Sequence, residues 1–111
     1  EKLMVHVIVR FEIKEGSLEH FVKVFSQVLP AVRAEQGCIQ YEPTVDLTDP
    51  DVTLPATPHP NTMTLIEKWE SVDALKAHLV AEHMTEHRLR VKDMIKSTEI
   101  QLLRGVNDMN E

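Results

Sequence analysis

The stretch TLIEKWESVDALKAHLVAEHM, residues 64–84, decides the fold because it joins a strand pattern directly to a helix pattern. Apolar and polar side chains alternate up to residue 70, which is typical of a strand with one buried face. Ser71 is a common helix N-cap residue, and apolar or aromatic side chains then recur at helical spacing. This stripe consists of Val72, Leu75, His78 and Leu79. We therefore expect a strand over residues 62–70 and a helix immediately after it.

The N-terminal part of the chain has the same order of patterns. Residues 3–13 alternate and place six apolar side chains on one face, namely Leu3, Val5, Val7, Val9, Phe11 and Ile13. After a turn at Gly16, an apolar stripe at helical spacing runs from Leu18 to Val32. Pro30 lies inside this run and is expected to kink the helix or to end its regular part. Residues 38–46 predict a second strand, in which Pro43 indicates an edge or a bulge.

The remaining segments complete a β-α-β, β-α-β order. Residues 47–61 hold four of the six prolines and predict a long loop. A further helix is expected from about Met84, with its apolar register given by Met84, His87, Val91, Met94 and Ile95. Residues 98–104 predict a fourth strand, and the polar tail 106–111 is expected to fray. The predicted fold is a ferredoxin-like split β-α-β sandwich of the α+β class, with helices on one face of an antiparallel sheet.

Composition limits the class of protein. A chain of 111 residues suits one domain, here 1–111 with a core over about 3–104. The net charge of −6 argues against a nucleic-acid partner. Cys38 is the only cysteine, which excludes an intrachain disulfide. No apolar run approaches the roughly 20 residues that cross a bilayer, so no membrane partner is expected and the cytoplasm is the default location.

The sheet face that the helices leave open should need a partner. We expect it to carry Ile8, Ile66, Ile100 and Leu102 among polar residues such as His6 and Arg10. Sheet-to-sheet association of two copies is the simplest way to cover such a face, and it predicts a homodimer.

Three polar or aromatic side chains stand where a structural pattern would have aliphatic ones. Strand alternation puts Glu67 and Trp69 on the face beneath the helices, and helical spacing points His78 at the same layer. A buried carboxylate needs a partner, because leaving it unpaired costs several kcal/mol. The three side chains therefore predict a small-molecule pocket between sheet and helices. The alternatives are that the strand parity slips and exposes Glu67, or that His78 and Trp69 are ordinary core residues.

His83 and His87 are four residues apart on the predicted helix and bear on a possible metal site. A helical pair of this spacing can bind a metal ion. The surrounding EHMTEH lacks the HExxH order, and no third ligand is evident. A helix start with solvated imidazoles is the preferred interpretation, and no metal site is predicted.

Two segments of the chain resemble the antibiotic-biosynthesis monooxygenase family. They are EGSLEHFVKVFSQVLPAVRAEQGCIQY, residues 15–41, and LIEKWESVDALKAHLVAEHM, residues 65–84. The shared patterns are E-x-G-C-x-x-Y at the second strand and I-E-x-W-x-S-x-x-A-L-x-x-H-L followed by a further histidine, here His83. The resemblance covers about residues 5–103 and is greatest to bacterial quinol monooxygenases.

The resemblance implies a dimeric α+β barrel that oxygenates a quinol or similar small aromatic with dioxygen and needs no cofactor. Such a reaction requires a base for the phenolic proton, and we expect His78 to be that base because an imidazole is largely neutral at pH 7. We expect Glu67 to fix its tautomer and to stabilise the imidazolium. Trp69, Tyr41 and Phe25 would offer stacking surface, and His83 would also contact the substrate. Two alternatives remain open. Haem-degrading members resemble this chain at Trp69 and His78 but have an asparagine where this chain has Val9. The other alternative is a non-catalytic protein of the same dimeric fold that binds a small molecule.

Overall fold

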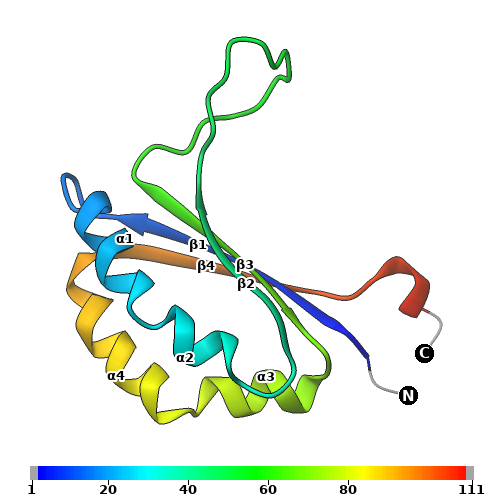
Figure 1. The fold of residues 1–111 in the computed structure, drawn as a ribbon. Helices are drawn as coiled ribbons and strands as arrows, with labels where there is room; N and C mark the ends of the chain where they lie inside the picture. The colour runs from blue at the N-terminus through cyan, green and yellow to red at the C-terminus, as the bar shows by residue number, and fades with distance from the viewer. Residues whose placement is uncertain (1–2, 110–111) are drawn as a thin grey trace.

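Four antiparallel strands form one sheet in the computed structural model, which describes residues 3–109 (Figure 1). The strands are β1 (Val5–Ile13), β2 (Cys38–Val45), β3 (Thr62–Trp69) and β4 (Ile95–Leu103). Their order across the sheet is β2-β3-β1-β4, so consecutive halves of the chain interleave. This is the split β-α-β topology that the sequence predicts, and the α+β ferredoxin-like fold is confirmed. Pro43 lies on β2, which is an edge strand as expected.

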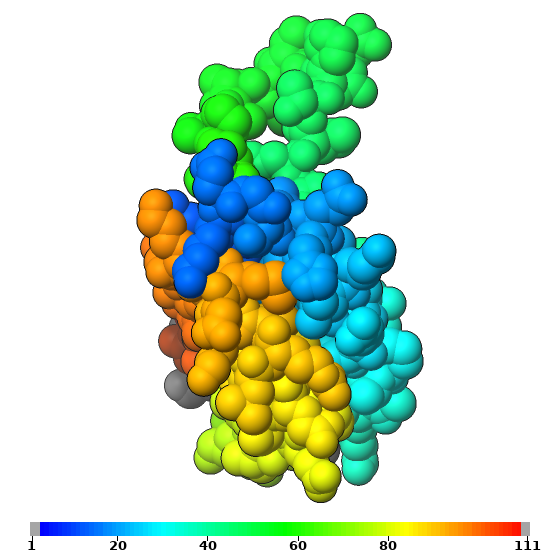
Figure 2. All heavy atoms as spheres, turned by 90° about the vertical axis from the view of Figure 1, so that its left-hand side faces the viewer, coloured from blue at the N-terminus to red at the C-terminus, as the bar shows by residue number. Residues whose placement is uncertain are grey.

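The helices lie together on one face of the sheet (Figure 1). They are α1 (Leu18–Ser26), α2 (Leu29–Arg33), α3 (Val72–Leu79) and α4 (Glu82–Val91), with short 3-10 turns at Lys92–Met94 and Val106–Asp108. Figure 2 shows α1 and α4 side by side, and the two helices are in contact. Within residues 3–109, no helix combines the length and apolar character that crossing a bilayer requires.

Local chemistry accounts for the helix ends. The hydroxyl of Ser71 accepts a hydrogen bond from the backbone N–H of Ala74 at 3.1 Å, which confirms the predicted N-cap. The first helix breaks between Ser26 and Leu29, and Pro30 lies in the first turn of α2. Its missing N–H costs nothing there, because the first turn of a helix has no intrahelical acceptor for it.

The C-terminal boundaries differ from the sequence prediction. The last α-helix begins at Glu82 rather than at Met84, and Ile95 begins β4 instead of ending the helix. The 3-10 turn before Ile95 reverses the chain, and a register shift between Glu12 and Ile13 lets Ile95 pair with Ile13. Val106–Asp108 forms a short turn in the segment predicted to fray, whose last two residues, like residues 1 and 2, lie outside the described range.

The core lies between the sheet and the helices. Alternate side chains of β1 and β3 are buried there, including Val5, Val7, Val9 and Leu65. They lie against the buried aromatic residues of α1, Phe21 and Phe25. Burying a large apolar side chain stabilises a fold by about 1.5–3 kcal/mol, so this layer supplies most of the driving force. The loop over residues 46–61 projects away from it and holds no regular secondary structure (Figures 1 and 2).

The open face of the sheet differs from the prediction at β4. Ile100 pairs with Val9 and Leu102 pairs with Val7. Directly paired residues of an antiparallel ladder point to the same side, so both side chains belong to the helix-covered face. They are about two-thirds exposed, at 66% and 65%, because little of the helical layer covers β4. Ile8 and Ile66 do pair on the open face as expected.

Candidate active site

Strand β3 and helix α3 bring the predicted carboxylate, indole and imidazole together. Glu67, Trp69 and His78 are 5%, 0% and 2% exposed, so all three are buried beneath the helical layer. The Trp69 and His78 rings lie 4.6 Å apart between centroids, at 34°. The predicted convergence of these three side chains is therefore confirmed, and strand parity does not slip.

Glu67 makes its hydrogen bond within its own strand. The Trp69 indole Nε1–H donates to Glu67 Oε1 at 2.8 Å. Burial raises the pKa of Glu67 to about 7, while the indole bond lowers it and the charge of Glu35 raises it further. A carboxyl group with such a pKa can hold or release a proton near neutrality, which is a common property of acid–base groups in active sites.

The carboxylate that contacts His78 is Glu35, which corrects the predicted pairing of His78 with Glu67. Both carboxylate oxygens of Glu35 lie within 3.1 Å of His78 Nδ1. The same carboxylate reaches His83 Nε2 at 2.6 Å, so Glu35 bridges two imidazoles. A carboxylate accepts hydrogen bonds, and Nδ1 of His78 therefore carries the hydrogen. This leaves Nε2 as the nitrogen that can accept a proton.

A glycine fixes the position of Glu35 in the turn between α2 and β2. Gly37 has a φ of +86°, and a Cβ built on it would lie 2.5 Å from the Cβ of Ala74 on α3. Only glycine allows this backbone conformation and this close approach of the helix. The backbone N–H of Glu70 also donates to the Gly37 carbonyl at 2.9 Å. The turn thus lies against α3 and is hydrogen-bonded to the residue that follows β3, and Glu35 comes to lie beside His78.

The His78 imidazole is mainly neutral at pH 7. Burial lowers its pKa, and the hydrogen bond and charge of Glu35 only oppose that effect. Tyr41, 5.4 Å from His78 between ring centroids, is a poor proton acceptor or donor. Burial raises the Tyr41 pKa far above its ordinary value, with the charges of Glu67 and Glu35 adding to it. Of these two groups, His78 is the one that can accept a proton near pH 7, and Tyr41 lines the cavity described next.

These side chains border a cavity of about 310 Å³ between the sheet and helices α3 and α4. Its polar or aromatic wall includes Phe25, Tyr41, Glu67, His78 and His87, and its apolar wall includes Val9, Leu65, Met84, Val91 and Ile100. Phe25 and Tyr41 stack at 6.3 Å and 11°, which gives a flat ligand an aromatic surface. A volume of this size is at the lower end of the range for small-molecule sites.

Trp69 and His83 stand behind this wall rather than in it. Trp69 packs against His78 and holds Glu67, whereas His83 contacts the outer side of Glu35 and is partly exposed. The sequence predicted direct substrate contact for both. The structure instead gives them the position of groups that orient the cavity residues, and it brings Phe25 and Tyr41 to the cavity as expected.

His87 is buried on α4, which contradicts the prediction of a solvated imidazole at a helix start. It borders the cavity, and its ring meets Phe25 edge-on at 4.7 Å. Burial, followed by the charges of Arg90 and Arg88, lowers its pKa to about 4. Among residues 3–109, no cluster of three or more His, Cys, Asp or Glu side chains could hold a metal ion.

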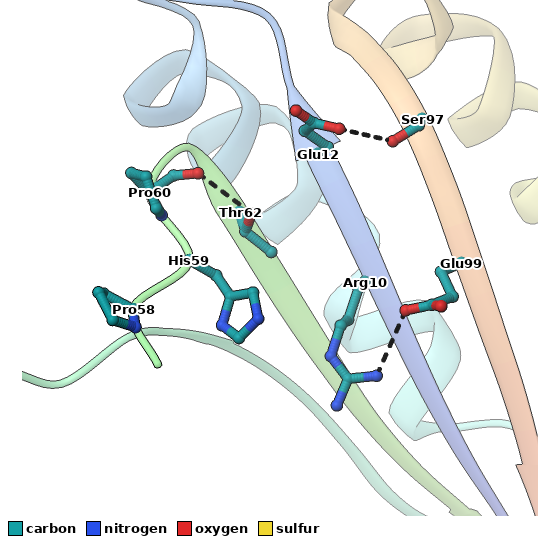
Figure 3. A pocket seen from close by; sticks show the side chains of 8 residues that line it. All are labelled: Arg10, Glu12, Pro58, His59, Pro60, Thr62, Ser97 and Glu99. Atoms are coloured by element: carbon teal, nitrogen blue, oxygen red, sulfur yellow. Dashed lines mark hydrogen bonds and ion pairs between the residues drawn. The ribbon is translucent and has the colours of Figure 1, made fainter. Parts of the chain in front are cut away.

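A second hollow, of about 460 Å³, lies on the open face of the sheet beside the long loop (Figure 3). Polar side chains of its lining pair with one another: Arg10 lies 3.7 Å from Glu99, and Ser97 Oγ donates to Glu12 at 2.9 Å. It contains none of the residues of the Glu35–His78 cluster. The cavity beneath the helices is therefore the candidate active site.

Comparison with known proteins identifies the family of the chain. The model of the family "Antibiotic biosynthesis monooxygenase" matches residues 4–89. The chain belongs to this family. A member named "Probable quinol monooxygenase YgiN", from Escherichia coli strain K12, is 34% identical over 79 residues, which are 71% of this chain and 74% of that protein.

Solved structures share the family fold. A candidate antibiotic biosynthesis monooxygenase from Caulobacter crescentus superposes with a TM-score of 0.79 at 21% identity, covering 95% of this chain and 92% of that one. Another, from Nitrosomonas europaea, has a TM-score of 0.78 at 17% identity and covers 97% and 95%. At such identities these likenesses show the fold alone.

Two site residues escaped sequence reasoning, although each had a signal. Glu35 is the glutamate of the E-x-G-C-x-x-Y pattern, and the glycine after it is the one that α3 requires. His87 shares the apolar register of Met84 and Val91, and that register predicts burial. Both signals were present, but neither named the partner that the side chain would meet.

Proposed function

We propose that the protein is a cofactor-independent monooxygenase that acts on a quinol or a similar phenolic aromatic with dioxygen. The observation that carries this proposal is the neutral, buried imidazole of His78, whose Nδ1 is held by Glu35 and which borders an aromatic cavity. Similarity to a protein named as a probable quinol monooxygenase supports the substrate class.

The reaction needs no cofactor because the substrate supplies the electrons. His78 Nε2 takes a phenolic proton, and such positioned proton transfer typically contributes about 10²- to 10⁴-fold to a rate. The resulting anion passes one electron to dioxygen, and the two radicals combine at a ring carbon that bears hydrogen. The His78 imidazolium returns its proton to the new peroxide, which becomes a C–O–O–H group. Cleavage of the O–O bond and loss of that hydrogen release water. One oxygen atom remains on the ring, and the product is a hydroxyquinone.

Glu67 has a separate task in this scheme. Its Oε1 accepts the indole hydrogen bond, so a proton on this carboxyl group is carried by Oε2. With a pKa of about 7, the group can donate that proton to the peroxide oxygen that leaves as water. Glu35 instead orients His78 and stabilises its imidazolium, which is the role that the sequence assigned to Glu67.

The proposed assembly is a homodimer formed through the open faces of two sheets. Ile8 and Ile66 pair at the centre of that face and are only half-buried in the single chain. A second copy would cover them and complete a dimeric α+β barrel. Light scattering should give twice the mass of the chain, and a monomer would contradict the proposal. A cytoplasmic location stays a prediction.

Oxygen uptake by metal-stripped protein across a panel of quinols tests the activity. We expect uptake with menadiol above the protein-free autoxidation rate, one atom of ¹⁸O in the product, and no stoichiometric hydrogen peroxide. Peroxide with unlabelled quinone would instead indicate an oxidase. Quenching of the single tryptophan, Trp69, without uptake would indicate a binding protein. A Soret shift with haem would favour haem degradation, although Val9 gives that site an apolar wall.

A further inference from the structure

Two cations stand at the opening of the candidate active site. Arg88 and Lys92 are among the residues that line the cavity beneath the helices, and both are exposed to solvent. They lie one helical turn apart at the C-terminal end of α4, where the backbone N–H of Lys92 donates to the Arg88 carbonyl. The cavity therefore meets solvent beside two positive charges.

The charge of this cavity is opposite to that of the whole chain. Its lining contains one acidic residue, Glu67, and burial raises the pKa of that residue to about 7, so it is only partly ionised at neutrality. Burial lowers the pKa values of His78 and His87, which are mainly neutral at pH 7. Arg88 and Lys92 thus make the cavity positive, although the chain carries a net charge of −6.

Neither cation has a carboxylate partner within residues 3–109. Arg90, on the same helix but outside the cavity lining, does have one and lies 3.7 Å from Glu86. Two like charges one turn apart also repel each other, which disfavours a helix. The helix dipole favours cations near the end of α4, but it does not account for their placement on the cavity side.

The guanidinium of Arg88 is held at the junction of α3 and α4. It donates to the backbone carbonyl of Leu79, the last residue of α3, at 2.8 Å. A guanidinium has five N–H donors, so this hydrogen bond leaves others for a ligand. Its charge also acts inside the cavity: burial lowers the pKa of His78, and the positive charge of Arg88 lowers it further.

An anionic group is the partner that suits this opening. A carboxylate accepts two parallel hydrogen bonds from a guanidinium and a further one from an ammonium, and such charge-assisted bonds are the strong ones. The interior behind the cations is mostly apolar or aromatic, with the stacked rings of Phe25 and Tyr41 on its wall. The ligand that matches both parts is a flat ring with a carboxylate at its edge.

We infer that Arg88 and Lys92 bind a carboxylate on the aromatic substrate and make the cavity selective for phenolic aromatic acids over neutral phenols. The inference rests on the proposed function only in taking a phenolic aromatic as the ligand. His78 receives the hydroxyl group, and the two cations hold the carboxylate at the opening. There the carboxylate stays in contact with water, so the cost of burying an ion does not arise.

Calorimetric titration without turnover tests this inference. The probes are 1-hydroxy-2-naphthoate and 6-hydroxy-2-naphthoate, each compared with its carboxamide, which has nearly the same shape and no charge. The wild type should bind at least one acid about tenfold or more tightly than its amide, as charge-assisted hydrogen bonds allow. The preference should shrink as salt is raised from about 0.01 M to about 1 M, because the screening length falls from about 30 Å to about 3 Å.

Substitutions on α4 separate the charge from the fold. Arg88→Gln combined with Lys92→Gln should bind acid and amide within about twofold of each other, since no cation is left for a charge-assisted bond. Lys92→Gln alone leaves the bond from Arg88 to Leu79 intact and should reduce the preference in part. Arg88→Lys, which keeps the charge, should also retain part of it. The control Arg90→Gln should retain all of it.

The amides report on the integrity of the cavity, and every variant should bind them as the wild type does. A wild type that binds the acids no better than the amides, or binds none of the four probes, would overturn the inference. A preference that survives the loss of both cations would overturn it as well. If the wild type prefers an acid but takes up no oxygen with any quinol, the proposed function fails while the anion site stands.

Discussion

Two carboxylates reach the candidate site from different parts of the fold, and their surroundings differ. Glu35 comes from the turn before β2 and lies between two imidazoles, whereas Glu67 comes from the middle of β3 and holds an indole. Glu35 is partly exposed, and Glu67 is buried. Glu35 therefore contacts two imidazoles whose protonated form its charge can stabilise. Glu67 contacts an indole N–H, which stays neutral.

In the proposed mechanism this difference gives the two carboxylates separate tasks. Glu35 raises the pKa of His78 and so opposes the effect of burial on that base. Glu67 has no basic partner among its hydrogen bonds, and burial raises its own pKa to about 7. In the proposed mechanism the first carboxylate acts through an imidazole, and the second is itself a proton donor near neutrality.

The largest effect should come from removing the imidazole that Glu35 serves. We expect His78→Ala to lower kcat/KM for menadiol oxygenation by about 10²- to 10⁴-fold, because a positioned base contributes that much. The initial rate of oxygen uptake by the variant would be compared with that of His20→Ala, an exposed histidine on α1. Light scattering should show the same assembly for both.

His78 is buried, so its removal also threatens the fold. His78→Gln keeps most of the volume and a hydrogen bond, and it should lose a comparable amount of activity while unfolding near the wild-type temperature. A rate for either variant within about twofold of the wild type would remove His78 from the mechanism, since a positioned base contributes far more. Glu35 would then orient a histidine that takes no part in the reaction.

The position of Glu67 can be predicted from the sequence, whereas that of Glu35 cannot, for a physical reason. Glu67 lies in a strand, where alternation assigns every side chain to a face, and its burial follows from the parity of Leu65 and Trp69. Glu35 lies in a turn, where no period relates one residue to the next. Its position depends on how closely Gly37 lets α3 approach, which is a tertiary contact. Strand and helix order was predictable, but the partner of His78 was not.

A similar limit explains the error at β4. Alternation assigned Ile100 and Leu102 to a common side, but it does not say which face of the sheet that side is. The register with Val9 and Val7 fixes the face, and this register depends on the bulge at Glu12 and Ile13. Single-strand periodicity gives relative orientation within a strand, and pairing across strands gives the rest.

Stability should depend on pH through Glu67 in a direction that is unusual for an acid. Its folded pKa of about 7 lies above the ordinary value of 4.5, so the folded state binds the proton more tightly than the unfolded state. The stabilisation is fully present below pH 4.5 and is lost as the pH rises through 7. Glu67→Gln, which cannot ionise, should therefore be more stable than the wild type at about pH 8.5, by up to about 3 kcal/mol, and similar to it at about pH 4.5.

Urea unfolding at fixed protein concentration, followed by Trp69 fluorescence, measures this difference. The amide oxygen introduced by Glu67→Gln still accepts the indole hydrogen bond, so the comparison isolates the charge. Glu70→Gln, just beyond the end of β3 and exposed, should show no such dependence. Equal stability of Glu67→Gln and the wild type at alkaline pH would mean that Glu67 ionises at no cost, and the two carboxylates would not differ as described.

The smallest effect should come from Glu35 itself, because it acts only through His78. Its hydrogen bond and charge raise the pKa of His78, so Glu35→Gln should lower that pKa further. The base must be neutral to accept a proton, and the acid limb of the kcat/KM profile should move to lower pH. The plateau should fall about tenfold, since a weaker base takes the phenolic proton less well. His83→Asn, which leaves the Glu35 charge in place, should move the limb less. A lower plateau of kcat/KM without a shift of its acid limb would show that Glu35 only holds the turn against α3, where Gly37 already allows close packing.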